Sequence, residues 1–124
     1  FVVLQTTSPL REPEDVDDSI ELFRKKNADS VISVCEAHYP PTSAIRVAPT
    51  RLISNYFTIK HKVNAQTEKA YTPNGAVYVF KYSLLKNKYS YIFDKTYAHI
   101  MPHERSIDID TMLDFKFAEF MMQR

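Results

Sequence analysis

The sequence predicts a mixed α/β domain that begins with a strand–helix–strand unit. An apolar run covers Phe1 to Leu4, a polarised amphipathic stretch covers Pro13 to Asn27, and a β-branched run covers Val31 to Cys35. Strand, helix and strand within about 35 residues form a βαβ unit, so the two strands should run parallel. A chain of 124 residues suits one domain with a modest core.

The stretch from Pro13 to Asn27 has the features of a helix with one buried side. Pro13 fits the first turn, where its missing N–H costs little, and Asn27 favours the left-handed conformation that ends helices. Val16, Ile20 and Phe23 recur at helical spacing and predict the buried stripe. The continuous apolar run before this helix is typical of a strand that is covered on both faces.

The other expected elements are shorter and less regular. In order, they are a hairpin of strands at 44–47 and 51–57, a long loop at 59–73, a strand at 76–80, one or two helical turns at 83–88, extended segments at 97–101 and 106–109, and a helix at 112–122. Long loops in compact domains are often functional. The last helix carries more apolar residues than one buried stripe requires.

Composition excludes several kinds of partner and site. The net charge of +1 favours neither nucleic acid nor an anionic membrane, and no apolar run approaches the roughly 20 residues that span a bilayer. Cys35 is the sole cysteine, which excludes an intrachain disulfide and fits a reducing, cytoplasmic compartment. The single glycine excludes a Gly-rich phosphate loop of the Walker or Rossmann kind within this chain.

Two carboxylates in the stretch SIDIDT, Ser106 to Thr111, carry the clearest chemistry. On a strand, Asp108 and Asp110 point to one side, and they repel each other unless a cation or protons neutralise them. Oxygen ligands of this kind suit Mg²⁺, which also contacts substrate phosphates. The alternative is that Asp110 or Thr111 caps the last helix, with Asp114 favouring its first turn. Taken alone, the pattern favours capping.

Two further stretches combine hydrogen-bonding groups with positions near strand ends. The stretch from Gln5 to Arg11 (QTTSPLR) follows the carboxyl end of a strand, where ligands bind in open α/β sheets. Arg11 can form a bidentate contact with a carboxylate or phosphate. An ordinary loop with capping hydroxyl groups explains it equally well. Asn74 and Gly75 precede a strand. They form either a turn or a place where the backbone of Gly75 approaches a ligand that Asn74 contacts.

Five segments in this order resemble one known family: LQTTSPLR, EDVDDSIELF, NADSVISVCEAHYPP, NGAVYVF and IMPHERSIDIDT. They resemble the acylneuraminate cytidylyltransferases, which are the CMP-N-acetylneuraminic acid synthetases and their relatives for other nonulosonic acids. The resemblance covers nearly all of 1–119. It implies a three-layer α/β/α nucleotidyltransferase (Rossmann-like) fold with a mostly parallel sheet, and a homodimer.

The resemblance also implies that residues 1–124 are the C-terminal part of a single cytidylyltransferase domain. Family members carry a Gly- and Arg-rich loop near the N-terminus that cradles CTP, and this motif is absent from the chain. We therefore expect a domain truncated on its N-terminal side, which alone can be inactive. The first strand would then be an interior strand of the family sheet.

The implied reaction is attack by the anomeric hydroxyl of the sugar acid on the α-phosphorus of CTP, with Mg²⁺ as the cofactor. Asp108 and Asp110 match the family's catalytic, metal-binding carboxylates. Gln5 matches the glutamine that contacts the sugar acid, and Tyr91 and Ile92 fall where a Phe-Phe pair often lines the pocket for its N-acyl group. The substrate-binding residues expected from pattern and resemblance together are Gln5, Thr7, Ser8, Arg11, Gln66, Asn74, Gly75, Tyr91 and Ile92.

One departure from the family pattern keeps other functions open. An Arg-Gln pair usually precedes the NGA strand, but here Ala65 stands before Gln66. Lys60, Lys62 or Lys69 would be an imperfect substitute, because an ammonium is not equivalent to a two-pronged guanidinium. The alternatives are a non-catalytic fragment or assembly module of the same fold, and a cytidylyltransferase for an eight-carbon sugar acid of the KDO type.

Overall fold

The computed structural model describes residues 1–56, 69–85 and 90–123, which fall into two compact units. Phe1–Cys35 and Pro73–Arg124 form the first, here called the sheet unit, and Glu36–Thr72 form the second, the hairpin unit. Within the described residues, no helix is long and apolar enough to cross a bilayer.

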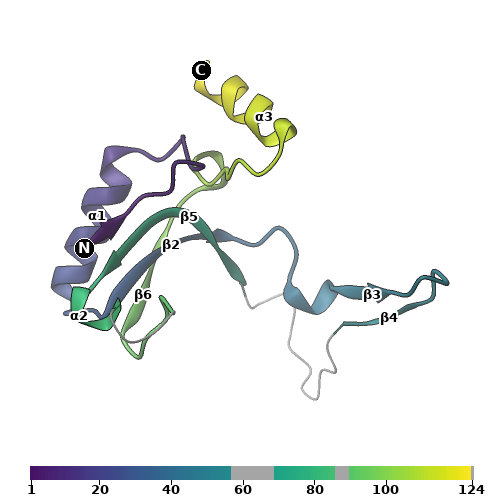
Figure 1. Ribbon diagram of the computed structural model, residues 1–124, viewed down its shortest axis with the longest axis horizontal. Coiled ribbons are helices and arrows are strands. Elements are labelled where there is room, and N and C mark those ends of the chain that lie inside the picture. The colour runs from purple at the N-terminus through teal and green to yellow at the C-terminus, as the bar shows by residue number, and fades with distance from the viewer. Residues whose placement is uncertain (57–68, 86–89, 124) are drawn as a thin grey trace. The chain divides into compact units, whose positions relative to one another are not determined.

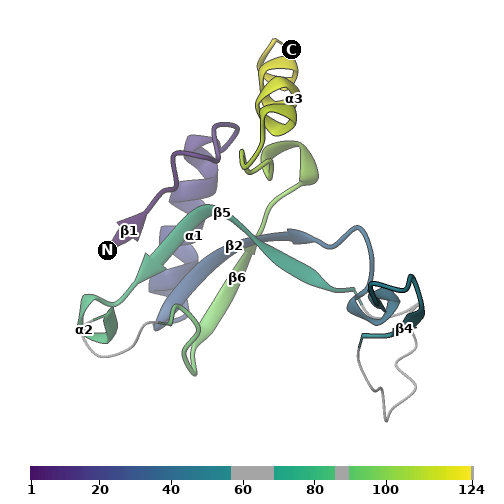
Figure 2. The same ribbon diagram turned by 45° about the vertical axis from the view of Figure 1, so that its right-hand side comes forward.

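The sheet has four described strands in the order β1-β5-β2-β6 (Figures 1 and 2). They are β1 (Val2–Val3), β2 (Ser30–Glu36), β5 (Tyr71–Phe80) and β6 (Thr96–Ile100). β2 and β6 are parallel, and β1 and β5 are antiparallel. β5 is also antiparallel to β2, because the Lys81 amide donates to the Asp29 carbonyl whereas the earlier Val77 amide donates to the later Ser33.

The α/β class is confirmed, but the described sheet is more mixed than expected. β1 and β2 run in the same direction, as the strand–helix–strand pattern predicts, yet β5 lies between them in the opposite direction. Only the β2–β6 pair is parallel among the described neighbours, so the expectation of a mostly parallel sheet is not met there. The sequence signals strands one at a time, whereas their order depends on contacts between distant segments.

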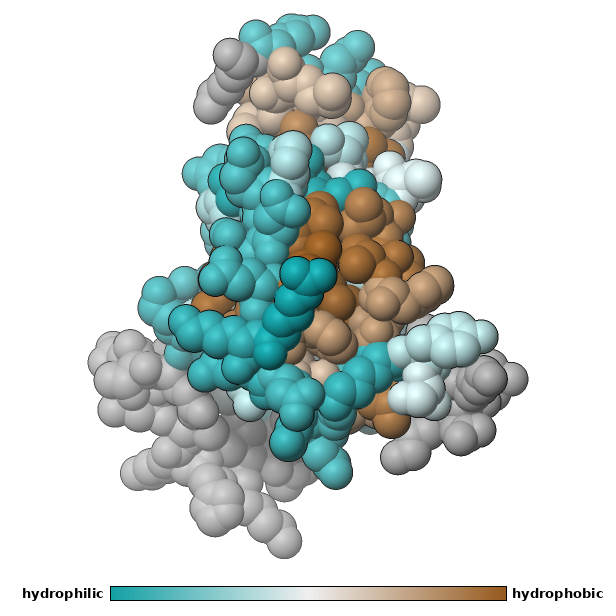
Figure 3. All heavy atoms as spheres, turned by 90° about the vertical axis from the view of Figure 1, so that its left-hand side faces the viewer, coloured by the Kyte–Doolittle hydropathy of each residue, from teal (hydrophilic) through white to brown (hydrophobic). Residues whose placement is uncertain are grey.

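The first strand is shorter and less buried than expected. β1 has two residues and lies at one edge of the described sheet, where Phe1 is 63% exposed and Leu4 is 42% exposed. Figure 3 shows apolar surface beside the polar side of α1 on the face of the sheet unit that includes this strand. The expectation of a strand covered on both faces is therefore wrong for the described residues, because Phe1, Val2 and Leu4 each keep more than a third of their surface exposed.

Helix α1 (Pro13–Lys25) covers one face of the sheet, as its periodicity predicts. Its apolar side chains Val16, Ile20, Leu22 and Phe23 pack on the cluster formed by Ala28, Val31, Ala76, Val77, Val79 and Met101. Pro13 occupies the first turn and Asn27 ends the helix with φ 46°, so both end signals are confirmed. Glu12 and Asp15 form a capping box at its beginning.

The opposite face carries a second apolar cluster. Ile32, Val34, Tyr78 and Phe80 are buried there, with Val3 and Phe93 packed against them. The two clusters alternate along β2 and β5, because successive strand residues point to opposite faces. Among the described elements, α1 is the helix that packs on the sheet clusters, so the three-layer arrangement stays a prediction.

The C-terminal half contains two short helices and one longer one. α2 (Tyr82–Leu85) overlaps the helical turns expected at 83–88, of which 86–88 lie outside the described residues. The 3-10 helix η2 (His103–Arg105) follows β6. α3 (Met112–Met122) is confirmed. It is apolar around its circumference, and its exposed large side chains are Met112, Leu113, Phe115, Phe117, Phe120 and Met122.

The hairpin unit contains the expected hairpin. β3 (Ile45–Val47) and β4 (Ile53–Asn55) pair in antiparallel fashion after the 3-10 helix η1 (Pro41–Ser43). Arg51 adopts φ 66° in the turn. The expected loop at 59–73 ends earlier than predicted, because β5 begins at Tyr71. Its 59–68 portion lies outside the described residues.

Candidate functional site

The structure brings together the three stretches that the sequence analysis singled out. The loop after β1 meets β5 through Ser8, whose Oγ donates to the Asn74 carbonyl at 3.4 Å. The same loop meets the segment after η2, because the Ile109 amide donates to the Thr7 carbonyl at 2.9 Å. Asn74 closes the set, with Nδ2 donating to Ser106 Oγ at 2.9 Å. We call this meeting of the stretches 5–11, 74–75 and 106–110 the candidate site.

Gly75 supports the Gln5 side chain. Gly75 has φ 76°, in the left-handed region that favours glycine. A Cβ atom at this position would clash with Gln5 Oε1 and lie 3.1 Å from Gln5 Cδ. The expected close approach to the Gly75 backbone is thus made by Gln5, whose exposed amide rests on it at the rim of the site.

The Asn74 side chain joins the strands to residues 106–110, which we call the acidic segment. It is 5% exposed, and its Oδ1 accepts from Ser33 Oγ at 2.6 Å and from the Ala76 amide at 3.2 Å. Its Nδ2 donates to Met101 Sδ at 3.3 Å as well as to Ser106. Protein groups therefore use both ends of the amide, and a substrate contact by Asn74 stays a prediction.

Arg11 holds the loop on β5. Its Nη1 donates to the carbonyls of Ala76, at 2.6 Å, and Gln5, at 3.2 Å. Within the same loop, Ser8 is buried and Thr7 is half-buried. The three residues order the backbone that presents Gln5, and their direct contact with a substrate stays a prediction.

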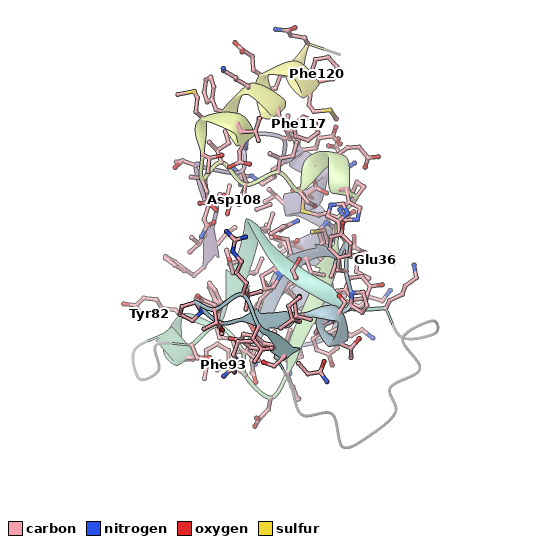
Figure 4. All side chains as sticks on the ribbon, turned by 90° about the vertical axis from the view of Figure 1, so that its right-hand side faces the viewer. Glu36, Tyr82, Phe93, Asp108, Phe117 and Phe120 are labelled. Carbon is pink, nitrogen blue, oxygen red and sulfur yellow. The ribbon has the colours of Figure 1, made fainter. Side chains whose placement is uncertain are left out.

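Asp108 has one carboxylate oxygen that burial leaves without a partner. Its Oδ1 is shielded from solvent and accepts no hydrogen bond from the described residues, and Figure 4 shows Asp108 between α3 and the sheet. A buried anionic oxygen without a donor is costly, so such an atom in a folded protein calls for an explanation such as an ion. Asp110, two residues on, is exposed.

The acidic segment is not a strand, which corrects the prediction for 106–109. The alternation of Ile and Asp resembles a strand pattern, but the Ile109 amide pairs with the loop residue Thr7. The segment forms the connection between η2, which ends at Arg105, and α3, which begins at Met112. The shared direction of Asp108 and Asp110 therefore does not follow from strand geometry.

Capping of α3 does not account for Asp108. Thr111 is the N-cap and accepts from the Asp114 amide, while Asp114 Oδ2 accepts from the amides of Thr111, at 2.7 Å, and Asp110, at 3.2 Å. Hydrogen bonds from Thr111 lower the pKa of Asp114. The capping interpretation is thus confirmed for Thr111 and Asp114, and Asp108 is left for another role.

The carboxylates fit the implied Mg²⁺ in kind and number. Mg²⁺ is held by one or two carboxylates together with substrate phosphates and water, and Asp108 offers an oxygen that lacks a donor. In the part of the chain that the structure describes, no three or more His, Cys, Asp or Glu residues gather into a ligand set. A site of this kind would therefore depend on substrate oxygens.

Tyr78 is a neighbour of Asp108 that the sequence analysis missed. Its pKa is raised by burial, and further by Tyr91 and by the charge of Asp108. The rings of Tyr78 and Tyr91 lie 5.5 Å apart at 52°, and Ser30 Oγ donates to the Tyr91 carbonyl at 2.9 Å. Tyr91 and Ile92 are 55% and 66% exposed. The signal that could have identified Tyr78 is its place in the predicted strand AVYVF, because successive side chains of a strand point to opposite faces.

The residues expected from the stretch before the NGA strand lie either outside the described residues or in the hairpin unit. Gln66 lies outside the described residues, as do Lys60 and Lys62. In the hairpin unit, the Lys69 ammonium lies 2.8 Å from Glu36 Oε2. An apolar cavity of about 360 Å³ beneath α3, lined by Pro9, Ile109, Phe115, Ala118 and Met122 among others, is lined by neither Asp108 nor Asp110.

A second missed feature is a buried carboxylate at the start of α1. Asp15 is 1% exposed, and Arg105 grips it with two prongs, Nε to Oδ2 at 3.0 Å and Nη2 to Oδ1 at 2.9 Å. The Glu12 amide donates to Oδ2 at 3.0 Å, and His99 Nε2 lies 3.3 Å from Oδ1. Burial alone would raise the pKa of Asp15, but the hydrogen bonds from Arg105, Glu12 and His99 lower it to about 2.

Comparison with known proteins agrees with the resemblance read from the motifs. The chain is 28% identical over 116 residues to an N-acylneuraminate cytidylyltransferase of Streptococcus agalactiae serotype V, covering 93% of this chain and 28% of that protein. It is 29% identical over 132 residues to the N-acylneuraminate cytidylyltransferase of Escherichia coli O18:K1:H7, covering 100% of this chain and 30% of that protein.

A third relative has a different name. Post-translational flagellin modification protein B of Campylobacter coli is 29% identical over 127 residues, covering 99% of this chain and 52% of that protein. No family model matches the chain. The chain thus spans less than a third of the length of the first two relatives. The expected resemblance is confirmed: over nearly its whole length, the chain is similar to N-acylneuraminate cytidylyltransferases.

Proposed function

We propose that the protein containing this chain is a cytidylyltransferase that joins CTP to a sialic-acid-type nonulosonic acid. The observation that carries the proposal is the buried Oδ1 of Asp108, which has no donor among the described residues and lies in a segment bonded to the stretches of Gln5 and Gly75. The names of the relatives from Streptococcus and Escherichia support the reaction class. In the reaction, an O–P bond forms between the anomeric oxygen and the α-phosphorus, the bond to pyrophosphate breaks, and the hydroxyl proton leaves.

Asp108 and Asp110 are the residues that would hold Mg²⁺. When bound, this ion supplies charge neutralisation at the α-phosphate and makes the attacking hydroxyl more acidic. The partial burial of Asp108 raises the strength of any such interaction, because a low dielectric weakens screening. Anchors on either side of Asp108, at Ser106 and Ile109, limit the movement of the carboxylate.

Gln5 is the residue proposed to orient the sugar acid. Its amide has both donor and acceptor groups, and Gly75 leaves the space in which that amide lies. Arg11 and Ser8 fix the loop behind it through their bonds to β5. Tyr91 and Ile92 are proposed to line the pocket for the N-acyl group, with Tyr78 packed behind Tyr91.

A non-catalytic assembly module is the second candidate. The exposed apolar side chains of α3 favour it, because contiguous apolar surface often marks an interaction site. The two proposals differ in whether Asp108 is required for a catalysed reaction. A homodimer is compatible with both and stays a prediction.

The test is pyrophosphate release by the complete protein with CTP, Mg²⁺ and a panel of nonulosonic acids that includes an eight-carbon sugar acid. We expect Mg²⁺-dependent release with a nine-carbon sialic-type acid, and loss of release in Asp108→Asn and Asp110→Asn. Asp17→Asn is the matched control, since Asp17 is an exposed carboxylate on α1. A folded wild-type protein without release would reject the proposal in favour of the module, and preferred use of the eight-carbon acid would correct the substrate.

A further inference from the structure

Arg105, the partner of the buried Asp15, lies directly before the acidic segment in the chain. Arg105 is the last residue of η2, and Asp108 follows three residues later. The side chain of Arg105 is committed to Asp15 by two hydrogen bonds, and its Nε also lies 3.5 Å from Glu12 Oε2. Two hydrogen bonds fix both the position and the orientation of the Arg105 guanidinium. The backbone toward Asp108 therefore continues from a residue that is held in place.

The anchor for Arg105 is itself rigid. Asp15 lies in the first turn of α1, where it also receives the Glu12 amide of the capping box. His99 of β6 approaches the same carboxylate, so one buried group ties the helix, the sheet and η2 together. A saturated buried carboxylate of this kind resists rearrangement, because any shift leaves donors or acceptors unpaired.

The acidic segment is then held at two further places. Ser106 Oγ donates to the Pro102 carbonyl at 2.7 Å and accepts from Asn74 Nδ2 at 2.9 Å. The Ile109 amide donates to the Thr7 carbonyl at 2.9 Å. Asp108 lies between these fixed points, and its buried Oδ1 has no donor of its own among the described residues. The orientation of the carboxylate thus depends on the backbone on either side of it.

We propose that Asp15 and Arg105 are positioning residues for Asp108, which set the metal-binding geometry of the acidic segment without touching the metal or the substrate. The inference deepens the proposed function and rests on it, because it requires Asp108 to be a metal ligand. Residues that orient ligands typically change metal affinity by about 10- to 100-fold when they are replaced.

The chain offers a matched control in a second ion pair. Lys81 Nζ lies 2.9 Å from Asp29 Oδ1, with side chains that are 37% and 23% exposed. This pair joins the end of β5 to the beginning of β2, and neither residue bonds to the acidic segment as the structure describes it. Removing the Lys81–Asp29 pair tests whether the loss of any ion pair in the sheet unit lowers metal affinity to the same degree.

The experiment measures Mn²⁺ binding to the complete protein in the presence of CTP, by the loss of the free-ion signal in electron paramagnetic resonance. Pyrophosphate release is measured in parallel as a function of Mg²⁺ concentration. The variants are Asp15→Asn, Arg105→Ala and Arg105→Lys, with Asp29→Asn as the control. Arg105→Lys keeps the charge but cannot form the two-pronged contact, and it decides the test if Arg105→Ala does not fold.

We expect Mn²⁺ affinity to fall about tenfold in Asp15→Asn and Arg105→Ala, and by a smaller factor in Arg105→Lys. The Mg²⁺ concentration for half-maximal rate should rise in step, with the KM for the sugar acid unchanged. Wild-type affinity in a folded Arg105→Lys and Asp15→Asn, or an equal loss in Asp29→Asn, would overturn the inference. So would a wild-type protein that binds no Mn²⁺. If the variants show the expected Mn²⁺ affinities but the wild-type protein releases no pyrophosphate, the proposed function is rejected and the positioning role is kept.

Discussion

Two carboxylates in the sheet unit differ sharply in how the protein treats them. Asp15 is buried and its two oxygens meet four nitrogen atoms, from Arg105, Glu12 and His99. Asp108 is partly buried and has an oxygen that is shielded from water and receives no hydrogen bond from the described residues. A saturated buried carboxylate stabilises the fold, whereas an unsatisfied one costs free energy unless something else binds it. The comparison separates a structural acid from a candidate ligand.

The largest expected effect comes from breaking the saturated site. Asp15→Asn should destabilise the protein by about 3 kcal/mol, because the buried carboxylate loses its charge-assisted bonds to Arg105, whose own side chain is 32% exposed. Urea unfolding of wild type and variant measures the difference. Asp17→Asn, at an exposed position on the same helix, should change stability by less than about 0.5 kcal/mol. Equal effects of the two substitutions would show that the buried contacts of Asp15 are unimportant.

The second largest effect is expected for Asp108→Asn, which should lower the rate of pyrophosphate release without lowering the free energy of unfolding. Loss of a metal ligand is expected to lower pyrophosphate release on the order of 100-fold or more. The unfolding free energy should stay the same or rise, since an unpaired anionic oxygen is removed. A variant with wild-type turnover would contradict the ligand assignment, and one that unfolds more easily would mean that Asp108 has structural partners.

These two carboxylates also show what the sequence can and cannot predict. Asp15 lies in the first turn of a helix, where acidic residues are a local signal that the sequence carries. Its partner Arg105 is 90 residues away, and no periodicity links them. Helix α1, its end at Asn27 and the core side chain Val16 were predictable because each depends on neighbours in the chain.

Other features failed where distant contacts decide the outcome. The acidic segment looked like a strand, but its amide at Ile109 pairs with a loop rather than a ladder. β1 looked fully buried, but its place at a sheet edge leaves Phe1 exposed. Of the two alternatives for Asn74 and Gly75, the simple turn is wrong, because the structure includes both in β5 and packs Gln5 on Gly75; a ligand contact by Asn74 stays a prediction.

A third substitution tests the support of Gln5. Gly75→Ala should destabilise the protein by about 1–3 kcal/mol, because Gly75 has φ 76° and the new Cβ meets Gln5 Oε1. If Gln5 orients the sugar acid, its displacement should also raise the KM for that acid, with the KM for CTP little changed. Steady-state kinetics at varied sugar concentration measures this. An unchanged KM in the folded variant would remove Gln5 from the substrate site.

The smallest expected effect is a dependence of stability on acid. The pKa of Asp15 is lowered from 3.8 to about 2 in the folded state, so its stabilising contribution is complete above about pH 5 and is lost as the pH falls toward 2. The shift corresponds to roughly 2 kcal/mol. Urea unfolding between pH 7 and pH 3 should therefore show a shallower loss of stability in Asp15→Asn than in wild type. Parallel curves would mean that Asp15 titrates normally in the folded protein.

The most direct test of the central claim, that Asp108 is a metal ligand and Asp15 is not, is paramagnetic broadening by Mn²⁺. Amide signals of the complete protein are recorded by NMR with CTP, before and after Mn²⁺ is added in small amounts. The account predicts strong, Mg²⁺-reversible broadening of the amides from Ser106 to Asp110, and of Thr7, which bonds to this segment. Broadening confined to other parts of the molecule, or none in this segment, would contradict it.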